Sequence, residues 1–466
     1  MADTASKHID MTTGSLWRNI SLFAFPVAAT SILEQLSNLI ATVIIGNFSG
    51  DQGTLAMAAV GSNVPLTSLM LNLFIGMSLG SNVVIANAIG RDDQNMVKRA
   101  VHTSILMALV GFVVIALGEI FAEPMLAALN VPAETMPLAS LYLRVFLLSM
   151  PSILLYNFEA AIFRSVGITR MPLQALAVST VLNIGLDLIF VPVLHWGVAG
   201  VAIATAIAYT VSAATLFIRL LKTGSVVRVT PRDLAIDPFA LKRIVKIGLP
   251  AGIQSAVFAV ANIIIQSAIN SLGTEVMAAS SAAMSLEYVC YNLLNSFSQA
   301  CTTFVGQNHG ARQIDRCTKT LKVCLVEGGI VALTTIIVIV GLGREILSLF
   351  NSDPNIVSIG YIRVCSIFPA YAFSMFYENM SGYLRGFEIS LPPAVLTMLG
   401  VCGVRLSWLR WVFPQYKTFM NIMLVFPISL ATTALLMLAA VLYFRPSRRY
   451  AHLQKSDGAA SAKIEG

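Results

Sequence analysis

Residues 99–121, RAVHTSILMALVGFVVIALGEIF, decide the class of fold. A helix needs about 20 mainly apolar residues to cross a bilayer, and this run has that length with charges only near its ends. Similar runs recur along the chain, so we expect about twelve spanning helices. Their approximate bounds are 17–46, 54–87, 99–121, 137–163, 169–193, 197–221, 244–271, 276–305, 318–342, 358–384, 388–412 and 418–444. The sequence therefore predicts an all-α integral membrane protein.

The composition excludes a soluble protein. Of 466 residues, 56% are hydrophobic and 11% are charged, whereas globular domains carry about 25% charged residues. The polar stretch from Met1 to Trp17 has no apolar core of a signal peptide, so we expect the first hydrophobic run to be retained. The six cysteines show no CxxC spacing, and we interpret them as small apolar fillers.

The basic residues predict the orientation. The tails and the loops after even-numbered spans hold 24 of the 30 lysines and arginines, while the loops 47–54, 122–137, 193–197 and 271–276 hold none. Basic loops stay in the cytoplasm, so we expect a multi-pass protein of the plasma (inner) membrane with both termini cytoplasmic. The net charge of +7 does not indicate nucleic-acid binding, because no basic face interleaved with aromatic residues is present.

The two halves of the chain resemble each other. Residues 142–145 (YLRV) recur as residues 361–364 (YIRV), and Pro26 and Asn38 correspond to Pro250 and Asn262. Such a repeat indicates two pseudo-symmetric six-helix lobes around a central cavity. The predicted parts are a tail (1–16), an N-lobe (17–221), a cytoplasmic linker (222–243), a C-lobe (244–445) and a second tail (446–466).

Several motifs point to one family. Residues 182–190 (LNIGLDLIF) and 197–205 (GVAGVAIAT) resemble the fifth and sixth helices of multidrug and toxic compound extrusion (MATE) transporters. Residues 55–61, 305–310 and 383–386 resemble further motifs of that family, in the same order. The resemblance covers roughly residues 17–445. It implies twelve helices in two lobes and export of organic, often cationic, compounds coupled to proton or sodium uptake.

These observations predict a secondary active antiporter and not an enzyme. No GxxxxGK[ST] phosphate-binding loop is present, so an ion gradient is the expected energy source and no cofactor is expected. We expect a monomer in the lipid bilayer whose partners are small organic, cationic substrates. One alternative is a lipid-linked oligosaccharide flippase of the same superfamily, which would need a basic cavity where these spans show acids. A non-transporting membrane partner protein would need a soluble module.

Asp187 is the strongest candidate for ion coupling, because an ionisable group at the bilayer centre costs at least about 2.5–3.5 kcal/mol. Asn183 lies one turn earlier, and Thr205 on the next helix can supply a third oxygen. Such oxygens suit sodium, and a carboxylate in a low dielectric suits proton exchange. The resemblance implies that these three residues form the N-lobe cation site. The alternative is a structural hydrogen bond between helices.

The first span departs from the family pattern. Residues 38–42 read NLIAT, where the family usually has Asn-Leu-Val-Asp-Thr, so Ala41 replaces an acid. Glu34 lies seven residues earlier on the same face, about 10 Å away. It is a candidate to replace the missing proton carrier or to attract a cationic substrate. The alternative is a carboxylate bonded to Gln35 or Asn38.

Acids and aromatic residues in the C-terminal half suggest a substrate cavity. Glu287 lies next to Tyr288 and near Tyr291, a combination that attracts cations. The candidate cavity residues are Glu287, Glu378, Tyr288, Tyr291, Gln254 and Asn262. For Glu159 and Glu378, local ion pairs with Arg164 and Arg385 are the alternative.

Three further residues have expected structural roles. Arg144 and Arg363 begin corresponding spans at their outer ends, where we expect their side chains to extend to the membrane interface. Pro26 interrupts the first span. The resemblance implies that the helix of Pro26 bends when Asp187 is protonated.

Overall fold

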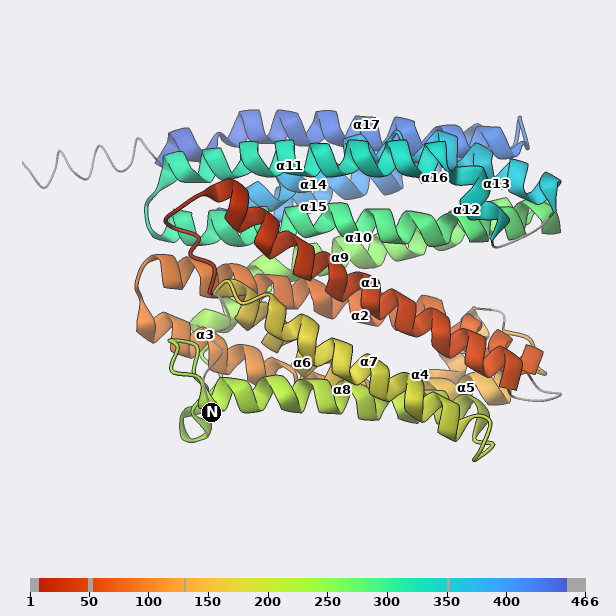
Figure 1. Ribbon diagram of the computed structural model, residues 1–466, viewed down its shortest axis with the longest axis horizontal. Coiled ribbons are helices and arrows are strands. Elements are labelled where there is room, and N and C mark those ends of the chain that lie inside the picture. The colour runs from red at the N-terminus through yellow and green to blue at the C-terminus, as the bar shows by residue number, and fades with distance from the viewer. Residues whose placement is uncertain (1–7, 49–52, 130, 350–352, 451–466) are drawn as a thin grey trace, which may run out of the picture. The chain divides into compact units, whose positions relative to one another are not determined.

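The computed structural model describes residues 8–48, 53–129, 131–349 and 353–450, and this part of the chain contains helices and no strand. The helices are numbered in chain order, with the labels used in Figure 1. Their bounds are α1 Leu16–Phe48, α2 Gly53–Gly90, α3 Gln94–Met107, α4 Val110–Ala128, α5 Met136–Leu147, α6 Met150–Ser165, α7 Arg170–Phe190, α8 Gly197–Lys222, α9 Pro238–Asn270, α10 Thr274–Gly310, α11 Ile314–Gly341, α12 Gly343–Ser348, α13 Pro354–Ile367, α14 Tyr371–Gly386, α15 Leu391–Thr397, α16 Val404–Trp411 and α17 Phe419–Phe444.

The helices account for the twelve predicted spans. Within the described ranges, nine helical stretches are long and apolar enough to cross a membrane when α3–α4 and α15–α16 each count as one, and two bent pairs raise that number to 11. The pairs are α5 with α6, bent by 46°, and α13 with α14, bent by 43°. The remaining predicted span corresponds to α10, which has 37 residues but carries acids such as Glu275 and Glu287. The prediction of an all-α membrane fold is confirmed.

The chain divides into two compact units. Unit 1 contains the described residues of 29–85 and 94–252, and unit 2 contains residues 9–28, 86–93 and the described residues from 253 onward. The first part of α1, up to Ala28, therefore packs within unit 2, and the rest of α1 packs within unit 1. This division falls two residues after Pro26, which lies inside α1.

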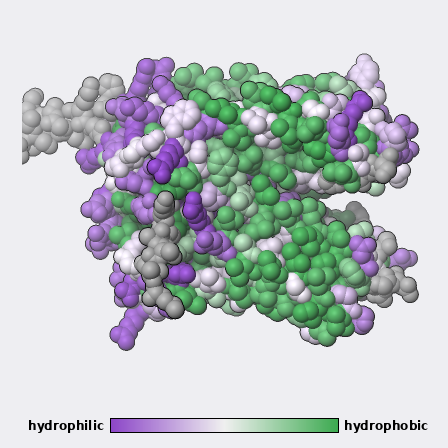
Figure 2. Space-filling view, viewed as in Figure 1, coloured by the Kyte–Doolittle hydropathy of each residue, from purple (hydrophilic) through white to green (hydrophobic). Residues whose placement is uncertain are grey.

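Apolar side chains cover the lengths of the helices, and polar side chains gather toward the helix ends (Figure 2). The exposed apolar residues include Phe112, Ile120 and Val181 in unit 1 and Ile337 and Leu435 in unit 2. Water does not stabilise such a surface, because soluble proteins rarely expose large contiguous apolar patches. The hydrocarbon of a bilayer is the solvent that suits these helices.

An N-terminal strap, residues 9–15, is held against unit 2. The side chain of Met11 is buried, and its carbonyl oxygen accepts hydrogen bonds from Asn308 Nδ2 (3.0 Å) and Arg316 Nε (3.1 Å). Arg316 also donates to the carbonyl oxygens of Thr13 and Gly14. These bonds fix the chain immediately before α1 begins.

The ends of α2 and α10 cross in unit 2 at two glycines. A Cβ atom on Gly90 would lie 1.9 Å from the carbonyl oxygen of Gln307, and one on Gly310 would lie 2.1 Å from that of Asn87. The contact is reciprocal, as expected where two copies of a repeat meet. Only glycine permits the two backbones to approach so closely.

A π-helical segment, Met398–Gly403, separates α15 from α16. A π-helix contains an additional residue per turn compared with the surrounding α-helix, and such segments are frequent at functional sites. Arg405, the second residue of α16, lies just after it and is buried in unit 2.

Candidate functional site

Asp187 lies near the end of α7 in unit 1. Its side chain is 0% exposed, and neither carboxylate oxygen has a hydrogen-bond partner among the described residues. The phenol of Tyr142, on α5, lies within electrostatic range of it. A buried carboxylate without a partner is costly unless it binds a cation or a proton.

Asn183 occupies the preceding turn of α7 and connects it to α1. Ser37 Oγ donates to Asn183 Oδ1 at 3.2 Å, while Asn183 Nδ2 has no partner in the described part of the chain. The sequence did not point to Ser37, because one serine among many small residues in a span carries no distinguishing pattern. The structure thus adds α1 to the Asp187 region.

Thr205 lies on α8, which packs closely against α7. Its hydroxyl donates to the carbonyl oxygen of Val201 at 2.9 Å, one turn earlier on the same helix. The hydroxyl proton is therefore used within α8, and the oxygen lone pairs are what Thr205 offers to a cation. The three candidate residues thus lie on two helices in contact, with oxygen atoms still available.

Glu34 is half-buried on α1 and interacts electrostatically with Arg164 of α6. Arg164 also interacts with Tyr156. The predicted local pair between Glu159 and Arg164 is wrong, since neither carboxylate oxygen of Glu159 has a hydrogen-bond partner among the residues described. Arg164 therefore interacts with Glu34 on another helix and not with Glu159 on its own helix.

The negative charge of Glu287, on α10 in unit 2, is paired with a buried arginine. Arg363 of α13 donates to it through Nε (2.5 Å to Oε1) and Nη2 (3.0 Å to Oε2). The prediction that Arg363 extends to the membrane interface is wrong, because its side chain is 3% exposed. Tyr288 is exposed, whereas the neighbouring Glu287 is buried, so the two do not form one wall.

The remaining cavity candidates in unit 2 are also engaged by basic residues. Tyr291 Oη donates to Glu378 Oε1 at 3.5 Å, and Arg385 lies within electrostatic range of Glu378. Arg385 Nη2 donates to Gln254 Oε1 at 2.8 Å. These contacts leave little unbalanced negative charge in this group.

Asn262 accepts a hydrogen bond from Arg405, a residue that the sequence analysis did not single out. Arg405 Nη1 lies 3.3 Å from Asn262 Oδ1, Nε lies 3.1 Å from Ser429 Oγ, and the guanidinium lies 4.4 Å from the ring centroid of Phe426. Its hydrogen-bond partners are neutral. An ionisable residue inside a predicted span was the available signal.

The MatE family model matches residues 26–189 and 250–408, which is more than half of the chain. The probable multidrug resistance protein YoeA of Bacillus subtilis is 26% identical over 436 residues, covering 91% of this chain and 92% of that protein. An FAD transporter of Shewanella oneidensis is 25% identical over 413 residues, covering 82% and 89%.

Solved structures show the same fold. A MATE crystal structure in complex with MaL6 matches with a TM-score of 0.87 at 20% identity, covering 96% of this chain and 99% of that chain. The chain therefore belongs to the MatE family of multidrug and toxic compound extrusion proteins and is a multi-pass membrane transporter.

Proposed function

We propose that this protein is a secondary active antiporter that exports organic, cationic small molecules in exchange for protons or sodium by alternating access. The observation that carries the proposal is Asp187, which is 0% exposed inside a spanning helix with both oxygens unpartnered among the described residues. A single negative charge in this environment favours uptake of one cation, whether a proton or a sodium ion.

In this proposal the cation binds Asp187, with Asn183 and Thr205 supplying further oxygens if the ion is sodium. Ser37 connects Asn183 to α1, so ion binding at α7 can alter α1. Pro26 interrupts the backbone hydrogen bonds of that helix and supplies a place for it to bend. Glu34, on α1, supplies a carboxylate in addition to that of Asp187 and can attract a cationic substrate.

The protein is proposed to act as a monomer in the plasma membrane, with both termini cytoplasmic and no cofactor or nucleic-acid partner. The test is dye efflux from proteoliposomes with an organic cation such as ethidium, under a proton gradient and then a sodium gradient. Asp187→Asn should abolish efflux driven by the coupling ion, while Glu123→Gln, at an exposed acid on α4, should not. Unchanged coupled efflux in Asp187→Asn would remove Asp187 from the mechanism, and the absence of ion-driven efflux from the wild-type protein would contradict the antiport proposal.

A second candidate is export of an organic anion, because the hydrogen-bond partners of the buried Arg405 are neutral. One relative is an FAD transporter, and FAD carries phosphates. Efflux of calcein, an anionic dye, in place of ethidium would favour this candidate.

A further inference from the structure

Glu327 lies in the middle of α11 and contacts the first part of α1. Ser21 Oγ donates to its Oε2 at 2.8 Å, whereas its Oε1 is buried and has no partner among the described residues. The residue is 7% exposed. Glu327 thus has the property that marks Asp187, a buried carboxylate oxygen without a donor, but it belongs to unit 2.

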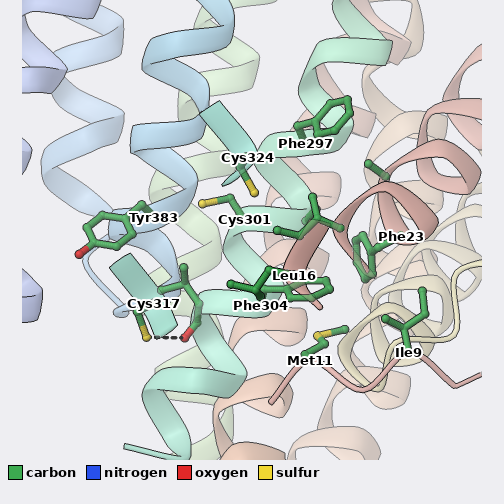
Figure 3. Packing of buried hydrophobic residues seen from close by; sticks show 14 of the residues in the cluster. Ile9, Met11, Leu16, Phe23, Phe297, Cys301, Phe304, Cys317, Cys324 and Tyr383 are labelled. Carbon is green, nitrogen blue, oxygen red and sulfur yellow. Dashed lines mark hydrogen bonds between the residues drawn. The ribbon is translucent and has the colours of Figure 1, made fainter. Parts of the chain in front are cut away.

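The surroundings of this contact are apolar. The first part of α1 packs against α10 through Phe23 and Phe304, whose rings are perpendicular with centroids 5.7 Å apart. Figure 3 shows this cluster, in which Cys301 and Cys324 lie next to each other, and their thiols interact. Cys324 lies one turn before Glu327 on α11. An apolar environment disfavours a permanent carboxylate charge.

Among the described residues, no basic side chain forms an ion pair with Glu327, which is buried and accepts the hydrogen bond from Ser21. Basic residues on the neighbouring helices are engaged elsewhere or exposed. Arg363 on α13 pairs with Glu287 of α10. Arg385 on α14 binds Gln254, and it is the basic residue in electrostatic range of Glu378 on the same helix. Arg344 on α12 lies over Tyr361, and Arg18 on α1 is exposed, as is Glu345 on α12. The thiol of Cys324 is a titratable group within electrostatic range of Glu327.

A second acceptor without a donor lies on the adjoining helix. Asn379 of α14 is buried, and its Oδ1 has no partner in the described ranges. Its Nδ2 lies 3.5 Å from the position that a Cβ of Gly328 would occupy, which places the amide beside the residue that follows Glu327. A proton on Glu327 would supply a donor to a region that contains unused acceptors.

We propose that Glu327 is a proton-binding site of this transporter, additional to the cation site at Asp187, which takes up a proton on its carboxylate and releases it to water during the transport cycle. Ser21 makes the site sensitive to the position of the first part of α1. The site supplies a buried carboxylate in addition to that of Asp187. This inference rests on the proposed antiport function.

The direct test is infrared difference spectroscopy of the full-length protein in lipid, between pH steps. A protonated carboxyl gives a carbonyl stretching band, and we expect Glu327→Gln to lose one such band. Ser21→Ala should shift that band to higher frequency, because the carbonyl loses a hydrogen bond. Glu345→Gln, at an exposed acid on α12, should leave the buried-carboxyl bands unchanged.

Either of two results would overturn the proposal: an unchanged difference spectrum in Glu327→Gln, or a band that responds to sodium but not to pH. Gel filtration and the Ser21→Ala shift separate loss of the site from loss of folding. This readout does not depend on transport. If the band titrates while neither a proton nor a sodium gradient drives efflux from the wild-type protein, the antiport proposal fails and the Glu327 site remains.

Discussion

Arg363 and Glu287 form a two-point ion pair between α13 and α10, and both side chains are buried. Ser280 accepts a third hydrogen bond from the same guanidinium. Paired hydrogen bonds between arginine and a carboxylate are among the strongest side-chain contacts. The pair explains why Glu287 of α10 does not serve as a cation site.

Removing one partner of this pair should destabilise the protein strongly. Arg363→Met leaves a buried carboxylate without its cation, and we expect a loss of about 3–5 kcal/mol in the free energy of unfolding. The double variant Arg363→Met/Glu287→Leu should recover most of that loss, because no buried charge remains. Thermal unfolding in detergent measures both.

The matched control is Arg144→Met, since Arg144 is 42% exposed and lies 3.2 Å from Glu123. An exposed pair contributes at most about 1 kcal/mol. An equal effect of the two arginine substitutions would mean that burial of the Arg363 pair has no energetic importance.

Ser37→Ala should weaken ion binding without removing it. The variant loses one neutral hydrogen bond to Asn183, worth about 0.5–1.5 kcal/mol, so we expect a roughly 2- to 10-fold rise in the ion concentration that half-saturates efflux. The measurement is proteoliposome efflux against proton or sodium concentration. Ser62→Ala, at a hydroxyl that donates only to its own helix, is the control. Equal half-saturation in both variants would exclude a role for Ser37.

Gly310→Ala should destabilise unit 2, because the new Cβ would lie 2.1 Å from the carbonyl oxygen of Asn87. Backbone must shift to relieve this clash, and overpacking of this kind costs about 1–3 kcal/mol. Gly61→Ala in α2 meets nothing within 4 Å and should instead stabilise the helix by up to about 1 kcal/mol. Thermal unfolding distinguishes them, and a neutral Gly310→Ala would show that the crossing is not tightly packed.

The N-terminal strap should loosen in acid. Burial acts to raise the pKa of Asp10, but hydrogen bonds from Thr13 and Thr12 outweigh it and lower the pKa from 3.8 to about 2. A carboxyl with a lowered pKa stabilises the folded form above its unfolded pKa, and this contribution disappears as the pH falls through the folded value. We therefore expect the strap to be stable at neutral pH and to loosen as the pH falls from about 4 to about 2.

Fluorescence of Trp17, with the other tryptophans replaced, can follow this transition. Thr13→Val removes one of the donors that lower the pKa, so the transition should move to higher pH. Asp10→Asn should remove the transition, and its persistence would assign the change to another group.

The spans were predictable because a bilayer requires long apolar runs, and hydropathy alone located them. The breaks within the spans were less predictable from the sequence. Pro151 and Pro369 lie at the bent pairs α5–α6 and α13–α14, but the interruption between α3 and α4 has no proline and is marked only by Gly111 at the start of α4. Packing against neighbouring helices determines such breaks, and a single sequence does not contain that information.

The candidate site was predictable in part. Asp187 was found because an acid inside a span is rare, and the same rule would have selected Glu327 and Arg405 had it been applied to every span. The position of Arg363 was predicted wrongly, since its partner Glu287 is 76 residues away in the chain. Depth in a membrane is approximate from sequence, and partners across helices are not encoded locally.

The π-helical segment before α16 sets the direction in which the rest of that helix faces. Successive residues of an α-helix are separated by about 100° of rotation, so one extra residue changes the phase of everything after it. Deleting Val401 would restore a regular helix and turn Arg405 away from Asn262 and Ser429. The additional residue therefore sets how the following residues are rotated about the helix axis. This rotation determines which side of the helix meets lipid.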